Sequence, residues 1–351
     1  MTSRERVLMS LRHEEPDRIP IHDSPWNTTI ERWKKEGLPA DGDVQKYFGY
    51  EFAGYGPNIC YFRKTEILEE TEEYRVERGL DGQTFKNWKK KTSTPGWQDF
   101  LIKSREDWYR HRHLLEWADD RIDMTTLPKS LEDRQKGLFV YYGLAIGYDR
   151  TQCFTGSERL LVALATDPEW VRDMFESNAY LVIRSAEEMM KRGFKFDGAL
   201  LFDDLGYRNA TLFSPEMYHQ ILQPCHKRIT RFFHDHGLPV ILHSCGCVKG
   251  IVPDLIESGF DCLQPLEVKA GMDLVALKKE FGKRLSFMGG IDVRKMSHPD
   301  PRVIEDEIRT KFAVAKVGGG YIYHSDHSVP DDVSFKAYSR VMELVRKYGA
   351  Y

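Results

Sequence analysis

The chain has 351 residues, of which 51 are Lys or Arg and 54 are Asp or Glu, so its formal net charge is -3 with neutral histidines. This near balance excludes a strongly basic protein that binds nucleic acid, and 41% hydrophobic with 30% charged residues is a globular rather than a disordered composition. Apolar runs are shorter than the ~18 residues of a membrane span, and the first twenty residues lack the apolar stretch of a signal peptide, so we expect a cytoplasmic protein that does not bind membranes.

The first third of the chain predicts a helical extension followed by a β-rich insertion. Residues 3–13 carry apolar side chains on one face, which indicates an amphipathic helix, and residues 28–36 predict a second helix. Between them, residues 18–22 predict a short strand. Residues 59–98 include an Asp-Gly pair at 81–82 between two alternating segments, which is a β-hairpin signal. We expect this β insertion to be a lid or the contact of a homodimer.

From residue 137 onward, short apolar segments alternate with helical ones, which is typical of an α/β protein with a parallel sheet. The predicted strands are 138–143, 199–202, 240–243, 262–265, 285–289 and 321–324. Strands at 18–22 and about 52–62 raise the number to eight, enough to close a (β/α)8 TIM barrel. An open, doubly wound sheet is the alternative. We prefer a barrel that spans 1–351 as a single domain, because polar residues follow so many of the strands, where barrel enzymes hold their sites.

A metal site is predicted where the strand at 240–243 ends. His243 and Cys245 are two residues apart, so in an extended chain their side chains point to the same side, as a Zn²⁺ site needs. A packed core thiol beside a capping histidine is the alternative interpretation. His327 is the preferred third ligand, because it would arrive from the last strand across the barrel mouth. The other candidates for that position are His324, Asp326, Glu267 and Cys247.

Two further groups are predicted around the same mouth. Asp203 and Asp204 follow the strand at 199–202 and could act as a general acid or orient a ligating histidine, with a helix cap or an ion pair as the alternative. Glu267 is another candidate acid or ligand. The predicted substrate-binding residues are Trp26, Tyr142, Tyr207, Asp292 and His324. Such aromatic residues are more often core or interface, and Asp292 is equally placed to cap the next helix.

Several stretches together resemble the uroporphyrinogen decarboxylase superfamily. They are 4–7, 16–20, 202–207, 214–218, 243–246, 263–267 and 287–292. The resemblance extends over nearly the whole chain, with 60–130 the least recognisable part. One branch of this superfamily, the true decarboxylases, has an arginine-rich segment after the first strand. Here residues 22–27 contain no arginine, so the carboxylates of a porphyrinogen would find few partners. The decarboxylases also do not require a His-x-Cys pair.

The resemblance is stronger to the second branch, the corrinoid-linked zinc methyltransferases. It implies zinc bound by His243, Cys245 and a later cysteine, where this chain has His327, a replacement that suits a harder oxygen substrate. The 25–39 segment is similar to members associated with O-demethylation of methoxylated compounds. No Asp-x-His-x-x-Gly pattern occurs, which implies that the corrinoid is carried by a separate protein.

The function predicted in this way is zinc-dependent transfer of a methyl group from a small methylated donor, such as a methoxylated aromatic, to the Co(I) corrinoid of that partner. Three alternatives stay open. They are decarboxylation of a porphyrinogen, methyl transfer from the methylated corrinoid to a thiol, and a catalytically silent barrel that only binds a corrinoid protein.

Overall fold

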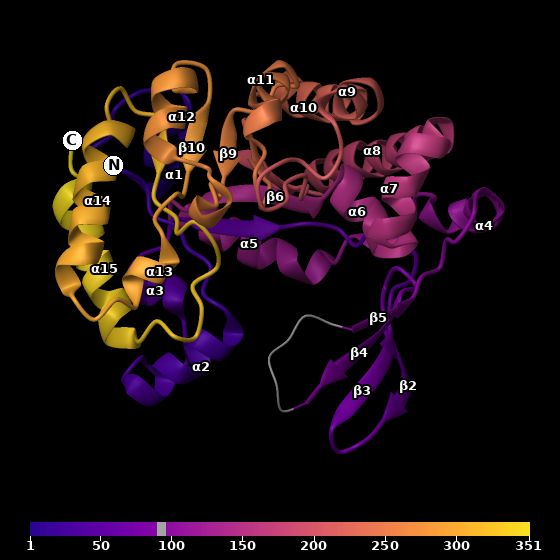
Figure 1. Ribbon diagram of the computed structural model, residues 1–351, viewed down its shortest axis with the longest axis horizontal. Coiled ribbons are helices and arrows are strands. Elements are labelled where there is room, and N and C mark those ends of the chain that lie inside the picture. The colour runs from indigo at the N-terminus through magenta and orange to yellow at the C-terminus, as the bar shows by residue number, and fades with distance from the viewer. Residues whose placement is uncertain (90–95) are drawn as a thin grey trace.

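The computed structural model describes residues 1–89 and 96–351, so residues 90–95 of the predicted insertion lie outside the described part of the chain. Figure 1 shows a body of sheet and helices from which a smaller antiparallel sheet extends. The main sheet has seven parallel strands in the spatial order β1-β6-β7-β8-β9-β10-β11. Their bounds are β1 (Phe52–Tyr55), β6 (Phe139–Ala145), β7 (Gly198–Phe202), β8 (Val240–His243), β9 (Cys262–Gln264), β10 (Ser286–Met288) and β11 (Tyr321–Ile322).

The predicted strand at 18–22 lies between the two edge strands of this sheet, β11 and β1. Ile21 forms an isolated parallel bridge with Tyr323, and its carbonyl accepts a hydrogen bond of 2.9 Å from the amide of Glu51. A longer ladder does not form here, since Pro20 has no amide hydrogen to donate. The predicted mixed α/β, TIM-barrel-like fold is therefore confirmed, with the eighth strand reduced to this bridge.

Helices cover the outside of the main sheet (Figure 1). Several begin where the sequence places a capping residue before Pro or an apolar run: Asp167, for example, accepts a hydrogen bond from the Trp170 amide at the start of the longest helix. The helices are α1 (Ser3–Leu11), α2 (Asn27–Glu36), α3 (Val44–Phe48), α4 (Arg105–His111), α5 (Leu127–Gln135), α6 (Gly147–Thr155), α7 (Ser157–Thr166), α8 (Pro168–Lys191), α9 (Pro215–Met217), α10 (Gln223–Asp235), α11 (Val252–Glu257), α12 (Leu274–Phe281), α13 (Val293–Met296), α14 (Pro301–Ala315) and α15 (Phe335–Gly349). Among the described residues, none of these helices combines the length and the apolar character that crossing a membrane requires.

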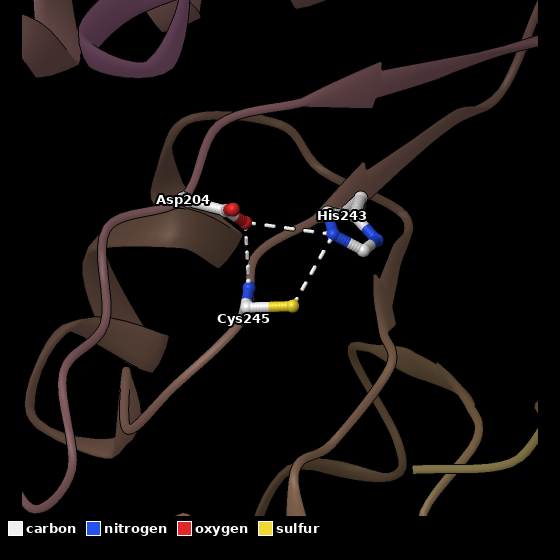
Figure 2. Close-up of side chains that lie close together, drawn as sticks. All are labelled: Asp204, His243 and Cys245. Carbon is white, nitrogen blue, oxygen red and sulfur yellow. Dashed lines mark hydrogen bonds and ion pairs between the residues drawn. The ribbon is translucent and has the colours of Figure 1, made fainter. Parts of the chain in front are cut away.

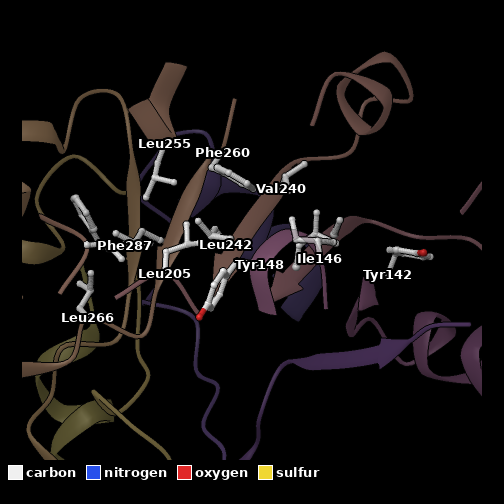
Figure 3. Packing of buried hydrophobic residues seen from close by; sticks show 14 of the residues in the cluster. Tyr142, Ile146, Tyr148, Leu205, Val240, Leu242, Leu255, Phe260, Leu266 and Phe287 are labelled. Carbon is white, nitrogen blue, oxygen red and sulfur yellow. The ribbon is translucent and has the colours of Figure 1, made fainter. Parts of the chain in front are cut away.

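Alternation along each strand creates two apolar layers. One set of side chains packs between the sheet and the helices, and Figure 3 shows part of it, including Val240 and Leu242 of β8. The other set fills the inside of the curled sheet. Its buried members are Val7, Leu11, Phe52, Phe139, Leu200, Ile241, Cys262, Met288 and Ile322. Because α1 supplies two of them and Phe52 and Phe139 are the first residues of their strands, α1 closes the end where the strands begin.

The segment with the hairpin signal forms a four-stranded antiparallel sheet rather than a single hairpin. Its strands are β2 (Glu66–Glu70), β3 (Tyr74–Arg78), β4 (Thr84–Trp88) and β5 (Gly96–Asp99), paired in that order. The Asp81-Gly82 turn joins β3 to β4, as the pattern predicts. An ion pair of 2.6 Å between Asp81 and Arg150 of α6 connects the turn to the body of the molecule. Whether this sheet acts as a lid or a dimer contact stays a prediction.

Candidate metal and active site

A cavity of about 310 Å³ lies at the end of the sheet where the strands finish. The last residues of β7, β8 and β9, which are Phe202, His243 and Gln264, all line it. The other lining residues are His22, Ser24, Tyr141, Leu200, Cys245, Pro265, His324, His327 and Ser328. This is the end at which α/β barrels gather catalytic groups from several strands.

Three potential metal ligands lie close together, Asp204, His243 and Cys245 (Figure 2), and the last two line this cavity. Their ligand atoms all lie within 4.8 Å of one another. His243 Nε2 is 3.4 Å from Cys245 Sγ and 3.4 Å from Asp204 Oδ1. The Cys245 amide donates a 2.9 Å hydrogen bond to the same carboxylate oxygen. A nitrogen, a sulfur and a carboxylate oxygen gathered in this way suit Zn²⁺ and leave a fourth position for a substrate.

A neighbouring amide fixes the orientation of His243. Its Nδ1 forms a hydrogen bond with Gln264 Oε1. Since a carboxamide oxygen can only accept, Nδ1 carries the proton and Nε2 keeps its lone pair on the side of Asp204 and Cys245. Burial lowers the pKa of His243 even though Asp204 opposes the shift, so the imidazole is in the neutral form that binds metals. Sequence reasoning did not single out Gln264, although it lies in one of the stretches that resemble the superfamily.

The electrostatic surroundings of Cys245 favour a cation. Burial raises the pKa of this thiol well above its usual value, and the negative charges of Asp204 and Glu267 raise it further. A thiolate here therefore requires a compensating positive charge. A bound divalent cation supplies such a charge and releases the thiol proton on binding, so the surroundings of Cys245 fit a metal site.

The two neighbouring carboxylates, Asp203 and Asp204, each predicted as a general acid or as a group that orients a histidine, lie in different surroundings. Asp203 is fully buried, and its Oδ2 lies 2.9 Å from His226 Nε2 while its Oδ1 accepts a 2.7 Å hydrogen bond from the Asp149 amide. Burial raises the pKa of Asp203 well above its usual value. Asp203 therefore connects α6 and α10 without lining the cavity, and of the two carboxylates only Asp204 reaches His243 and Cys245.

His327 lines the same cavity but lies outside the group of three, so the structure brings Asp204 rather than His327 to His243 and Cys245. The His327 ring packs edge-on against Trp26, with 6.2 Å between ring centroids. His324 also lines the cavity, and its Nε2 lies 2.9 Å from Ser24 Oγ. Both predicted residues are thus near the ligands without joining them.

Glu267 and Tyr207 line a second hollow, of about 540 Å³, which shares Cys245 with the first. Glu267 accepts a 2.7 Å hydrogen bond from the Gly246 amide and pairs with Lys269 at 2.9 Å. Burial works to raise the pKa of Glu267, but these two hydrogen bonds outweigh it and lower the pKa. An ionised Glu267 positions the loop that carries Cys245 and is poorly suited to donate a proton.

Three predicted substrate-binding residues, Trp26, Tyr142 and Asp292, do not line the cavity, although Trp26 lies against His327, which does. Tyr142 is fully buried against α8, where its hydroxyl is 2.8 Å from Ser185 Oγ. Alternation along β6 instead directs its neighbour Tyr141 into the cavity. Asp292 caps α13 by accepting a 3.0 Å hydrogen bond from the Arg294 amide and pairs with the Arg294 side chain at 2.7 Å. Asp292 does not line the cavity, and its position matches the alternative interpretation that it caps a helix.

Asp149 is a residue that sequence reasoning missed. It lies in the first turn of α6, after β6, much as Asp203 follows β7. Burial raises its pKa to about 7, and the charges of Asp204 and Asp203 contribute to the shift. A carboxyl group with such a pKa holds a proton about half of the time near neutral pH, which suits a general acid.

Fold and site together define the class: an α/β barrel-like enzyme whose candidate metal ligands meet at the carboxyl ends of the strands. The chain belongs to the family "Uroporphyrinogen decarboxylase (URO-D)", which matches residues 151–348. A solved structure described as a methyltransferase from Methanosarcina mazei shares the fold, with a TM-score of 0.66, 15% identity and 99% of each chain covered.

A curated relative, the methylcobamide:CoM methyltransferase MtaA of Methanosarcina barkeri, is 33% identical over 108 residues. These residues make up 31% of this chain and 30% of that relative, so the match spans less than a third of the relative's length. The resemblance to the superfamily is confirmed, and both of these proteins are described as methyltransferases.

Proposed function

We propose that this protein is a zinc-dependent methyltransferase that moves a methyl group from a small methylated donor, such as a methoxylated aromatic, to the Co(I) corrinoid of a separate protein. The observation that carries the proposal is the convergence of Asp204, His243 and Cys245, of which His243 and Cys245 line the cavity. The methyltransferase relatives support the reaction class.

The donor set indicates what the protein would do with the metal. Zinc would act as a Lewis acid on the ether oxygen of the donor, an effect worth several kcal/mol. The charges of Asp204 and of the Cys245 thiolate balance those of a divalent cation, and Gln264 keeps His243 Nε2 directed at the site. Tyr141, Leu200 and Phe202 line the cavity with apolar surface, which excludes water from the bound donor.

Methyl transfer from an ether leaves an oxygen that must take up a proton while the methyl group passes to cobalt. Asp149, whose pKa of about 7 keeps it partly protonated at neutral pH, is a candidate source of this proton, but it does not line the cavity, so the proton would have to reach the oxygen through bridging water. The corrinoid protein would have to dock over the cavity so that cobalt approaches the methyl carbon in line with the breaking bond.

Methyl transfer to a thiol is the second candidate function. It is favoured by the similarity to a methylcobamide:CoM methyltransferase over 108 residues. Against it, the group of three contains one sulfur and two harder donor atoms, which suits an oxygen substrate better than a thiolate-rich site would. Decarboxylation needs no metal, so it gives no role to the convergence of these ligands.

Metal analysis tests the site. We expect about one zinc per chain in the native protein and little or none in Cys245→Ala. Cys225→Ala is the matched control, because Cys225 is a buried cysteine of α10 whose thiol contacts Glu176, away from the cavity. Equal zinc in native protein and Cys245→Ala would contradict the site.

The reaction is tested separately by adding methyl ethers to the native protein with a reduced corrinoid protein and following the cobalt absorption spectrum. We expect demethylated product from native protein and a fall of roughly 1000-fold in Cys245→Ala. Product only when a thiol is added to the methylated corrinoid protein would favour the second candidate. Binding of the corrinoid protein without any product would contradict both and favour the silent barrel.

A further inference from the structure

A second group of potential metal ligands lies outside the cavity, in the outer layer of helices. His219 of the π-helical segment Tyr218–Leu222 meets Asp254 and Glu257 of α11, and the ligand atoms of all three lie within 4.8 Å of one another. Among the described residues, only this group and the one at His243 bring three such side chains so close together. None of the three lines the cavity, so the proposed mechanism does not use them.

Buried hydrogen bonds hold the two elements together directly beside the candidate ligands. The Tyr218 hydroxyl lies 3.0 Å from Ser258 Oγ, and each of these buried residues is the sequence neighbour of a candidate ligand. Gln223, which is also buried, donates a 3.1 Å hydrogen bond from its Nε2 to the Asp254 carbonyl. Because these bonds do not involve the ligand side chains, they fix the spacing of the two backbones before any ion binds. A site that is formed in advance loses less entropy on binding.

An ion can reach all three side chains from solvent, since their exposed fractions are 53% for His219, 24% for Asp254 and 59% for Glu257. His219 Nδ1 lies 3.5 Å from Asp254 Oδ1, which is longer than a good hydrogen bond, and Asp254 pairs with neither Lys nor Arg among the described residues. Lys227 pairs with Glu257 at 2.7 Å and lowers the pKa of that carboxyl. Because the Lys227 side chain is long and 41% exposed, it can turn into solvent when an ion binds.

The donor atoms indicate which ions fit. One imidazole nitrogen and two carboxylate oxygens are ligands of Zn²⁺ and of other divalent first-row metals, and the two negative charges balance those of the cation. This group contains no sulfur and is exposed to solvent, in contrast to the group at Cys245, so we expect it to bind zinc less tightly. Ordinary surface ion pairs are the alternative interpretation, but they do not account for Asp254, which has no Lys or Arg partner among the described residues.

We propose that His219, Asp254 and Glu257 bind a second divalent transition-metal ion, with Zn²⁺ as the expected occupant, which exchanges readily with solvent. The ion connects the Tyr218–Leu222 segment to α11 and leaves a coordination position to water or to a donor from another molecule. It is lost on dialysis, so the purified protein still carries about one zinc, at the first site. This inference does not rest on the proposed function, because neither a methyl donor nor a corrinoid takes part.

Calorimetric titration of the dialysed protein with Zn²⁺ tests the site. We expect native protein to take up one further zinc per chain, and its melting temperature to rise with added zinc. His219→Ala and Asp254→Asn each remove a direct ligand, so binding should weaken by at least about 100-fold. His236→Ala is the matched control, because His236 is an exposed histidine at the end of α10 whose Nδ1 lies 2.8 Å from the Phe232 carbonyl. Cys245→Ala also keeps the outer site, although it loses the first zinc.

A native protein that takes up no further zinc overturns the assignment. Equal uptake by native protein, His219→Ala and Asp254→Asn does so as well, since it would reflect nonspecific binding to surface carboxylates. Uptake that is lost in Cys245→Ala but kept in His219→Ala would place the second ion at the cavity, which also contradicts the outer site. Failure of the proposed function leaves this test unaffected, because the outer zinc is measured without turnover.

Discussion

The two ends of the main sheet are built from the same strands but serve different purposes. Where the strands begin, Val7 and Leu11 of α1 pack onto Phe52 and Phe139, and the interior is filled. Where the strands finish, the interior opens into the cavity of about 310 Å³ lined by histidines and Cys245. The closed end therefore contributes packing to the fold, whereas the open end holds polar side chains around a cavity.

Charges differ between the ends in the same way. At the closed end, Glu51 is buried but accepts hydrogen bonds from Arg6, from Arg18 at 3.0 Å and from the Ile21 amide at 2.6 Å. At the open end, Asp204 pairs with neither Lys nor Arg among the described residues, and the contacts of its carboxylate are the Cys245 amide and His243. Carboxylates matched by the protein stabilise the fold, and a carboxylate left unmatched near a thiol favours a cation.

The largest expected effect comes from Glu51→Gln at the closed end. Removing this charge leaves Arg6 buried with Asp17 as its remaining acidic partner, and breaking a buried pair costs about 3–5 kcal/mol. We expect the free energy of unfolding to fall by about 3 kcal/mol, because Asp17 compensates in part. Urea denaturation followed by circular dichroism measures the change.

Glu305→Gln is the control for this substitution. Glu305 also accepts from several groups, Lys347 at 2.8 Å and Arg340 at 3.1 Å among them, but these pairs are partly exposed. Its removal should cost less than about 1 kcal/mol. Zinc content per folded molecule should be unchanged in both variants. Loss of zinc in folded Glu51→Gln would show that the two ends are not independent.

A smaller effect is expected from Gln264→Leu at the open end. Gln264 accepts the Nδ1 hydrogen bond that directs His243 Nε2 to the candidate ligands. Loss of such a supporting hydrogen bond weakens metal binding by about 10- to 100-fold. Competition with a chelator of known zinc affinity measures this, and Gln264→Glu, which keeps an acceptor, should restore most of the affinity.

Gln223→Leu is the matched control, because Gln223 is also buried and donates a 3.1 Å hydrogen bond to the Asp254 carbonyl on the outer side of the sheet. It should bind zinc with native affinity. Native zinc affinity in Gln264→Leu would mean that His243 is oriented by packing alone or does not bind the metal.

The sequence is a good guide where local signals decide. The strands of the second half are short apolar runs, so they were predicted close to their observed bounds. Side chains of Asp167, Ser214 and Ser334 cap the helices that follow them. Helices α4 and α5, in the polar stretch between the insertion and residue 137, were not predicted. Their first turns follow irregular segments, and periodicity is weak over seven to nine residues.

The candidate site was predictable to the same extent. The two-residue spacing of His243 and Cys245 is local, so their convergence follows from strand geometry. That Asp204 rather than His327 lies beside these two residues could not be predicted from nearby sequence. The Asp204 carboxylate is held by a hydrogen bond from the Cys245 amide, which is 41 positions away along the chain. His22 gains its position only when the 18–22 segment bridges the two edges of the sheet, and no pattern in that segment announces this.

The smallest expected effect concerns Asp17, at the closed end. Hydrogen bonds from Arg6, at 2.6 and 2.8 Å, lower the pKa of Asp17 from 3.8 to about 2 against a small opposing effect of burial. A carboxyl whose pKa is lower in the folded state stabilises the fold above pH 4, and this contribution disappears as the pH falls from about 4 towards 2.

Because the Asp17 side chain is 48% exposed, solvent screening keeps its contribution below about 1 kcal/mol. We expect Asp17→Asn to be less stable than native protein at pH 5, with the difference shrinking as the pH is lowered to 3. Urea denaturation across this range measures it, with Asp235→Asn, an exposed carboxylate 4.0 Å from Arg231, as the control for the change in net charge. A difference that stayed constant with pH would mean that Asp17 acts through packing rather than through its charge, and the contrast between matched and unmatched carboxylates at the two ends would then rest on Glu51 alone.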